Sequence, residues 1–386
     1  MDVDVAIVGA GLAGAALARA ARGLRIALVA DEAAVPAPGP QGFDSRVYAI
    51  TPGNAGFLAT LGAWRRLAPE RLTPVRAMRV FGDDGRSLLE FDAYRAGVGE
   101  LAWIAEDGAL QRALRASLED AEQVRIVAPG RLERLEVAPD RARLQLRGGR
   151  TLDARLVVGA DGAQSLVREQ TGIAVTDTAY RQRAVVANFS CERAHRHCAY
   201  QWFQGGPVLA LLPLPGDHVS MVWSTGEDEA ERLLALDPQA LARAVAAASG
   251  HVLGELGLVT AARAFALRRL AARRMVAPRV ALIGDAAHVI HPLAGQGANL
   301  GLQDARALAA VLGGREPMRD PGDLRLLRRY ERARALEVGA MDATVHGLYR
   351  LFGAPARPCA ILRNSGLNLT EHLPVIKNLL IRRAMA

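Results

Sequence analysis

The chain has 386 residues, of which 51% are apolar, 23% charged and only 5% aromatic. This length and composition predict two or three globular domains with a substantial core and exclude a disordered protein. The net charge of +8 is uneven, because residues 323–386 alone hold 11 basic and 5 acidic side chains. With most of the excess in the C-terminal region and no recognition motif present, we do not expect nucleic-acid binding.

The compartment is indicated by cysteine content and by the N-terminus. Three cysteines in so long a chain do not form a disulfide framework, which favours a reducing compartment. Residues 1–4 lack the basic start of a secretory signal, and no apolar run reaches the ~18–20 residues that span a bilayer. We therefore expect a cytoplasmic protein.

The N-terminal segment has the pattern of a dinucleotide-binding unit. An apolar strand expected at 5–8 leads into Gly9, Gly11 and Gly14, and a helix is expected at 15–22. The first glycine permits a tight turn, the second lets a pyrophosphate approach the backbone, and the third lets helix and strand pack closely. The free N–H groups of the helix then face the phosphates.

The acidic residue of this fingerprint is less well defined. A second strand is expected at 26–30, and the residue at its end should bind ribose hydroxyls. Ala30 occupies that position, and Asp31 and Glu32 follow. We take Asp31 as the candidate, with a solvated turn as the open alternative.

Two later segments repeat the arrangement of a strand followed by glycine and an acidic residue. The strand that starts at Arg155 leads to Asp161 and Gly162. The strand at 280–283 leads to Gly284 and Asp285. A loop and a helix predicted at 298–312 follow, and they contain His288, Pro292, Gly295, Gln296, Gly297, Ala298 and Asn299. The helix is expected to stop at Gly313-Gly314.

The three motifs in this order resemble those of the class A FAD-dependent monooxygenases, which share the para-hydroxybenzoate hydroxylase fold. Segments 44–50, 103–114 and 206–214 are similar to the ubiquinone-biosynthesis hydroxylases within that class, as is the tail 373–377. The resemblance covers nearly the whole chain. It implies an α/β fold in which a Rossmann-like FAD-binding domain carries an inserted mixed-sheet substrate domain and a helical C-terminus.

From this resemblance we assign the FAD-binding domain to residues 1–72, 100–180 and 275–386. The substrate domain takes residues 73–99 and 181–274, where strands are expected at 185–189 and 219–223. Pro213, Pro215 and Gly216 predict a hairpin turn.

The resemblance also implies roles for individual residues. Asp285 binds the ribityl chain of FAD, Arg46 and Gln111 contact its phosphate and ribityl region, and Asp161-Gly162 lies near the cofactor. The helix after Gly297 directs its N-terminus at the flavin, where reduction creates negative charge. Pro292 forms the wall beside the ring.

The implied activity is hydroxylation of a polyprenylated phenol through a flavin C4a-hydroperoxide, with NADH or NADPH and O2 as co-substrates. His288 and His291 lie beside the expected flavin, where they could act as a general base or only make structural hydrogen bonds. Three alternatives remain: another aromatic substrate, a prenyl reductase, and a non-catalytic subunit of a quinone-biosynthesis complex. A halogenase is disfavoured, because its active-site lysine is missing and Lys377 is the only lysine.

Two further features have competing interpretations. Cys191, His195, His197 and Cys198 suggest zinc, but their spacing is not that of a zinc site, so we expect no metal. The C-terminal segments 345–352 and 375–381 combine apolar and basic residues, with Pro374 placed to start a short helix. They could contact an inner-membrane surface peripherally or form ordinary packing helices.

Overall fold

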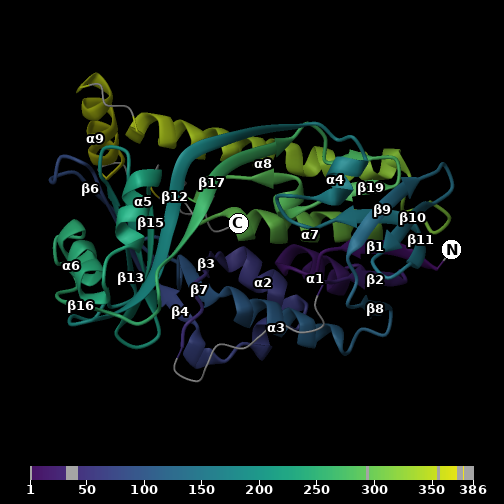
Figure 1. Ribbon diagram of the computed structural model, residues 1–386, viewed down its shortest axis with the longest axis horizontal. Coiled ribbons are helices and arrows are strands. Elements are labelled where there is room, and N and C mark those ends of the chain that lie inside the picture. Colours follow the sequence, from purple (N-terminus) through teal and green to yellow (C-terminus); the bar gives the residue numbers. More distant parts are fainter. Residues whose placement is uncertain (1, 32–41, 293–294, 354–356, 372–376, 378–386) are drawn as a thin grey trace.

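The fold is that of a computed structural model, which describes residues 2–31, 42–292, 295–353, 357–371 and 377. Two large sheets lie at opposite ends of an elongated molecule, and the long helix α8 (Leu324–Gly353) runs past both of them (Figure 1). A small third sheet lies between them. The predicted α/β fold with a mixed sheet and a helical C-terminus is thereby confirmed.

The first large sheet has a parallel centre. Its strands run in the order β18 (Val276–Ala277), β19 (Val280–Leu282), β11 (Arg150–Gly159), β1 (Val3–Val8), β2 (Ile26–Val29) and β8 (Val124–Val127). From β19 to β8 every neighbouring pair is parallel. The antiparallel strands β10 (Ala142–Leu146) and β9 (Leu132–Val137) extend it from β11. The carboxyl ends of β1, β2, β11 and β19 therefore meet at one edge.

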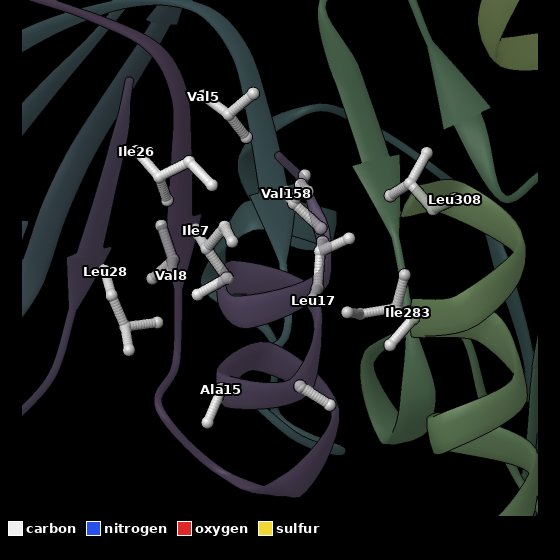
Figure 2. Close-up of a cluster of buried hydrophobic side chains, with 14 of the residues drawn as sticks. Val5, Ile7, Val8, Ala15, Leu17, Ile26, Leu28, Val158, Ile283 and Leu308 are labelled. Atoms are coloured by element: carbon white, nitrogen blue, oxygen red, sulfur yellow. The ribbon is translucent and has the colours of Figure 1, made fainter. Parts of the chain in front are cut away.

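The main hydrophobic core lies between this sheet and helices α1 (Leu12–Ala20) and α7 (Gly297–Gly313). In Figure 2, Ile7 of β1, Val158 of β11 and Ile283, directly after β19, face Leu17 of α1 and Leu308 of α7. All five side chains are fully buried. Because each buried large aliphatic side chain contributes about 1.5–3 kcal/mol, this apolar centre holds the glycine-rich turns above it in place.

The second large sheet has nine strands. Its order is β20 (His288–Val289), β17 (Arg263–Ala272), β12 (Val175–Cys191), β15 (His218–Gly226), β14 (Val208–Leu214), β13 (Cys198–Phe203), β5 (Ala77–Phe81) and β6 (Leu88–Asp92), with β16 (Leu256–Leu258) beside β12. Side chains alternate between its faces. Val185, Ala187 and Phe189 pack with helices α5 (Glu227–Leu234) and α6 (Pro238–Ala248). Ala184, Val186 and Asn188 point to the other face.

That other face contacts the small sheet, whose strands are β3 (Val47–Ile50), β7 (Ala102–Glu106) and β4 (Thr73–Val75). Ile104 and Val75 of the small sheet cluster with Ala199 and Leu214 of the large one. Helices α2 (Pro52–Thr60), α3 (Asp107–Leu118) and α4 (Leu166–Gln170) and the 3-10 turns η1 (Trp64–Arg66) and η2 (Pro69–Arg71) complete this part.

Helix α8 connects the two ends of the molecule. Tyr330 is fully buried in the main core and donates to the carbonyl oxygen of Leu282 at 2.9 Å. Asp342 pairs with Arg269 of β17, and Phe352 stacks on Phe203 of β13. Helix α9 (Arg357–Glu371) follows. Within the described ranges, no helix is both long and apolar enough to cross a membrane.

The elements predicted from sequence are present, with small shifts at their ends. Helix α1 starts at Leu12 and not at residue 15, because Gly11 already has the extended backbone of a helix cap. The strands expected at 185–189 and 219–223 lie within β12 and β15, and β14 and β15 form the predicted hairpin. The domain boundaries stay a prediction, and β12 runs across the one placed at 180/181. Pro374 and, apart from Lys377, the other residues after Glu371 lie outside the described residues.

Candidate cofactor site

The three glycine-rich motifs converge at the carboxyl edge of the parallel sheet. Gly9 follows β1, Asp31 follows β2, Asp161 follows β11 and Gly284 follows β19. In open α/β sheets, this edge is where ligands bind. Sequence segments more than 270 residues apart thus form one site.

The three glycines of the turn from β1 into α1 differ in the space around them. Gly9 has φ +103°, and a Cβ there would clash with the carbonyl oxygen of Ala160. A Cβ on Gly14 would clash with the carbonyl oxygen of Gly9, so helix and strand pack too closely for a side chain. Around Gly11, by contrast, a Cβ would meet no atom of the described residues within 4 Å. Because no side chain caps α1, its first N–H groups face this open space.

The third motif packs directly on the first. The turn η3 (Gly284–Ala286) begins at Gly284, which has φ +58°. A Cβ at Gly284 would lie 3.4 Å from the Cβ of Ala13 in α1 and 3.7 Å from Gly301 in α7. The small residues at these positions therefore let the turn, α1 and α7 approach one another.

Arg168 joins the second motif to the third. Its Nη1 donates to the carbonyl oxygen of Ala286 at 2.9 Å, and its Nη2 donates to that of Ala163 at 2.8 Å. Burial lowers the pKa of this guanidinium, although Asp161 opposes the shift. Asp161 accepts from the backbone of Val167 at 3.2 Å, while its Oδ1 is buried without a partner. Gly162, beside it, has φ +80° and open space around it.

Charged groups gather in front of the third motif. Arg46 lies over the Phe265 ring, with its Cζ 4.9 Å from the ring centre. Burial opposes its charge, but Tyr48, Asp107 and Asp285 outweigh burial and raise the pKa of Arg46. Asp285 is reached by solvent, yet surrounding protein raises the pKa of its carboxyl, with His288 and Arg46 opposing the shift. The site therefore offers one arginine and one crowded carboxylate to a ligand.

Gln111 is held in this site by a residue that sequence reasoning missed. Its Nε2 donates to Oδ1 of Asp107, the first residue of α3, at 2.7 Å. Burial raises the pKa of Asp107 and also that of Tyr48. Both residues lie inside the segments that carried the family resemblance, but only the packing of β3 against β7 shows that they meet Arg46.

The start of α7 points its N–H groups into the same region. In the part of the chain that the structure describes, Gln296 is the cap position but makes no side-chain cap bond, and a Cβ on Gly297 would meet no atom within 4 Å. Ala298 is half-buried. Asn299 is fully buried, and its amide bonds to protein: Oδ1 accepts from Thr51 N and Asn54 Nδ2, and Nδ2 donates to Ala49 O at 2.8 Å.

Asn299 therefore joins α7 to β3 and α2. A direct cofactor contact by its side chain remains a prediction, since the donors and the acceptor of the amide already have protein partners.

The loop between β20 and α7 links the cofactor edge to the nine-stranded sheet. His288 is 5% exposed, and its Nε2 is 2.6 Å from Oδ2 of Asp304. His291 bonds to Oε1 of Gln182 in β12 at 3.2 Å and packs edge-on against Tyr180. Burial lowers the pKa of His291 to about 4, so the ring is neutral at neutral pH. Pro292, next in the chain, is half-buried, and its carbonyl accepts from Gly295 N at 3.0 Å.

The nine-stranded sheet supplies the opposite wall. Asn188 of β12 is fully buried and donates to the carbonyl oxygen of Asp44 at 2.9 Å. Phe265 of β17 lies under Arg46. Of the four residues considered for zinc, Cys191 ends β12, Cys198 begins β13, and both histidines lie in the connection between these strands. His195 Nε2 bonds there to the carbonyl oxygens of Leu214 and Gly216.

The residues present fit FAD. Open space at Gly11 and Gly297 lies at two uncapped helix N-termini, which suit a pyrophosphate and a reduced flavin. The partnerless Oδ1 of Asp161 and the exposed carboxylate of Asp285 suit hydroxyl donors. Asp31 is exposed two residues after the end of β2, one residue beyond the position of Ala30 where a ribose-binding residue is expected.

Comparisons with known proteins agree with this geometry. The family model described as "FAD binding domain" matches residues 2–343. The ubiquinone hydroxylase UbiL of Rhodospirillum rubrum is 36% identical over 99% of this chain and 89% of its own length. The 3-demethoxyubiquinol 3-hydroxylase of Escherichia coli is 34% identical over 99% of this chain and 98% of its own.

The solved structure of p-nitrophenol 4-monooxygenase PnpA from Pseudomonas putida matches with a TM-score of 0.79 and 18% identity, covering 99% of this chain and 98% of that one. At that identity the likeness concerns the fold alone. The chain belongs to the FAD-binding-domain family of flavoprotein monooxygenases, in the group of the ubiquinone-biosynthesis hydroxylases.

Proposed function

We propose that the protein is an FAD-dependent hydroxylase that adds oxygen to the ring of a polyprenylated phenol in ubiquinone biosynthesis, using O2 and NADH or NADPH. The observation that carries the proposal is the convergence of three motifs, far apart in sequence, at one sheet edge that faces a second sheet. The two ubiquinone hydroxylases that match nearly the whole chain support the substrate class.

Once bound and reduced, FAD supplies the electrons that activate O2 for transfer to the ring. The chain's part is to hold the cofactor. In this proposal Gly9, Gly11 and Gly14 admit the pyrophosphate to the start of α1, and Asp31 binds the adenosine ribose. Asp285 and Asp161 accept from ribityl hydroxyls, and Arg46 and Gln111 bind along the phosphate and ribityl region.

The residues at the start of α7 would hold the flavin ring in this proposal. Gly295, Gln296, Gly297 and Ala298 bring backbone N–H groups close to the edge of the ring that becomes negative on reduction. Asn299 holds this helix start through Ala49, and Pro292 forms the adjoining wall. The phenol ring is oriented between this loop and the nine-stranded sheet, where water is excluded.

The face of that sheet suits an apolar substrate. Ala184 and Val186 of β12 pair with Ser224 and Val222 of β15, so all four side chains share the face opposite α5 and α6. Ala210 of β14, paired with Val222, continues this face. These side chains are small and uncharged, and all but Ser224 are apolar, so they would leave room for a prenylated ring without offering competing charges.

Neither histidine is the proposed base. His288 is buried and its Nε2 is bonded to Asp304, and burial lowers the pKa of His291 to about 4, which makes its neutral ring a weak base. We assign His288 a structural part and Pro292 the wall position, and the hydroxyl group of the phenol itself activates the ring toward oxygen transfer.

We further propose a cytoplasmic enzyme with peripheral contact at the inner membrane through its C-terminal helices, where a polyprenylated substrate enters. Leu336 and Leu348 of α8 and Leu369 of α9 are exposed, at 80%, 38% and 64%. Liposome flotation tests this: a Leu336→Ser, Leu348→Ser, Leu369→Ser variant should stay unbound while the wild type floats. Equal flotation of the variant and the wild type would contradict the proposed membrane contact.

The function is tested by reconstituting the protein with FAD and supplying a prenylated phenol with NADH or NADPH. Substrate-dependent oxidation of the nicotinamide with a ring-hydroxylated product is expected. A product with a saturated prenyl chain and no O2 consumption would indicate a prenyl reductase. No substrate-dependent oxidation would indicate a non-catalytic subunit. Hydroxylation of only an unprenylated ring would keep the chemistry and change the substrate.

A further inference from the structure

A buried carboxylate lies behind the cofactor turn and does not face the cofactor itself. Asp304 of α7 has no exposed surface. Its Oδ2 accepts from the backbone N of Gly284 at 2.9 Å and lies 2.6 Å from Nε2 of His288. Its Oδ1 accepts from Nε of Arg334 at 2.7 Å. One side chain thus holds the third motif, the following strand and α8.

The charges of this cluster compensate one another. Burial disfavours the ionised form of Asp304, but His288 and Arg334 outweigh burial and lower the pKa of the carboxyl. Arg334 is 3% exposed and also donates to Gln303 Oε1 at 3.1 Å and pairs with Glu337. A buried ion pair of this kind gives weak net stability but strongly disfavours loss of one partner.

The hydrogen bond from Gly284 N to Asp304 links the buried carboxylate to the cofactor turn. Gly284 has φ +58°, in the left-handed region, and opens the turn that presents Asp285. A carboxylate that accepts its N–H selects one conformation of that turn. Removal of the carboxylate would leave a buried N–H group without a partner.

We propose that Asp304 is a positioning residue for the flavin half of FAD: it sets the Gly284–Asp285 turn, and Arg334 of α8 sets Asp304. This inference rests on FAD being the cofactor of the proposed function. It assigns to α8 a part in cofactor binding although no residue of α8 needs to touch FAD.

Asp304→Asn is the sharpest variant, because asparagine has nearly the same shape. Its amide nitrogen must take either the Oδ2 position, facing Gly284 N–H, or the Oδ1 position, facing Arg334 Nε–H. Either orientation brings two donors together and loses a bond. Arg334→Met removes the hydrogen bond that Arg334 Nε donates to Oδ1 of Asp304.

The matched control is Asp342→Asn. Asp342 also lies on α8 and pairs with an arginine, since Arg269 Nε is 2.8 Å from its Oδ1. That pair joins α8 to β17 and makes no contact with the Gly284 turn. Asp342→Asn therefore measures how weaker packing of α8 alone affects cofactor affinity.

The measurement is the Kd of the apoprotein for FAD and, separately, for ADP, which carries only the adenosine and pyrophosphate half expected at α1. Asp304→Asn and Arg334→Met should weaken FAD binding about tenfold or more and change ADP binding less than about twofold. Asp342→Asn should change neither by more than about twofold.

Two results would overturn the inference: unchanged FAD affinity in Asp304→Asn, or equal losses for FAD and ADP, which mark a merely structural carboxylate. If Asp304→Asn fails to fold, His288→Leu removes a single contact of the cluster, because leucine has no donor for Asp304 Oδ2, and should show the same split between FAD and ADP. A wild-type protein that binds ADP but not FAD would refute the proposed function instead.

Discussion

Arg168 donates from Nη1 to the carbonyl oxygen of Ala286 at 2.9 Å, and this bond joins two motifs that are more than 110 residues apart in sequence. The same guanidinium holds the carbonyl oxygen of Ala163. Because Arg168 is buried, both acceptors depend on it, and the turns after β11 and β19 keep a fixed separation.

Arg168→Met should therefore destabilise the fold by about 2–3 kcal/mol, since it leaves two carbonyl groups without their donor. Urea unfolding of the apoprotein measures this difference. Arg22→Met, at an exposed position after α1, is the control and should fall within about 0.5 kcal/mol of wild type. Equal stability of the two variants would show that Arg168 does not join the motifs.

Gly11 and Gly14 should respond differently to alanine. Gly11→Ala has a normal φ of −68° and open space, so its stability should stay within about 0.5 kcal/mol of wild type while its Kd for FAD rises about tenfold. Gly14→Ala should instead destabilise the apoprotein, because its Cβ meets the Gly9 carbonyl. FAD titration and urea unfolding of both variants distinguish the two effects. A Gly11→Ala variant with unchanged FAD affinity would contradict the pyrophosphate assignment.

Arg46→Lys keeps the charge but loses the planar fork and the stacking on Phe265. We expect its Kd for FAD to rise about tenfold. Phe265→Leu removes only the stacking, worth about 0.5–1 kcal/mol, and should raise Kd about two- to fivefold. Flavin fluorescence titration of both variants tests the ranking, which would be wrong if the phenylalanine variant were the weaker binder.

Acid should destabilise the protein partly through His291. Burial lowers its pKa from 6.5 to about 4 in the folded state. Between these values the unfolded chain binds a proton that the folded chain does not, so stability is present above pH 6.5 and is lost as the pH falls toward 4. The loss attributable to His291 is about 3 kcal/mol.

His291→Gln should reduce the acid-dependent loss, which urea unfolding at pH 7 and pH 4.5 measures. The difference between wild type and variant isolates His291 from carboxyls that titrate in the same range. Parallel stability curves for the two proteins would show that His291 is protonated when folded.

The contiguous motifs could be predicted because the residues within each motif are sufficient to specify its local structure. An apolar strand followed by Gly9 or Gly284 specifies a turn at a sheet edge, and the structure places both there. The positioning contacts could not be predicted in this way. Asp304 is 20 residues from Gly284 and 30 residues from Arg334 in the sequence. No local sequence pattern predicts contacts between residues so far apart.

The structure also shows which basic side chains of the C-terminal region form ion pairs. Arg329 pairs with Glu316, Arg334 with Asp304, and Arg363 with Asp83. Several basic side chains of this region are therefore paired with acidic side chains of the same molecule. Composition counts charges, but only the packing of α8 and α9 shows which of them are compensated.

The most direct test of the central claim follows oxygen from O2 into the product. The FAD-loaded protein is given NADH or NADPH, a prenylated phenol and isotopically labelled O2, and the product is analysed by mass spectrometry. We predict a ring-hydroxylated product that carries one labelled oxygen atom. A product oxygen derived from water, or nicotinamide oxidation that yields only hydrogen peroxide with every prenylated phenol supplied, would contradict it.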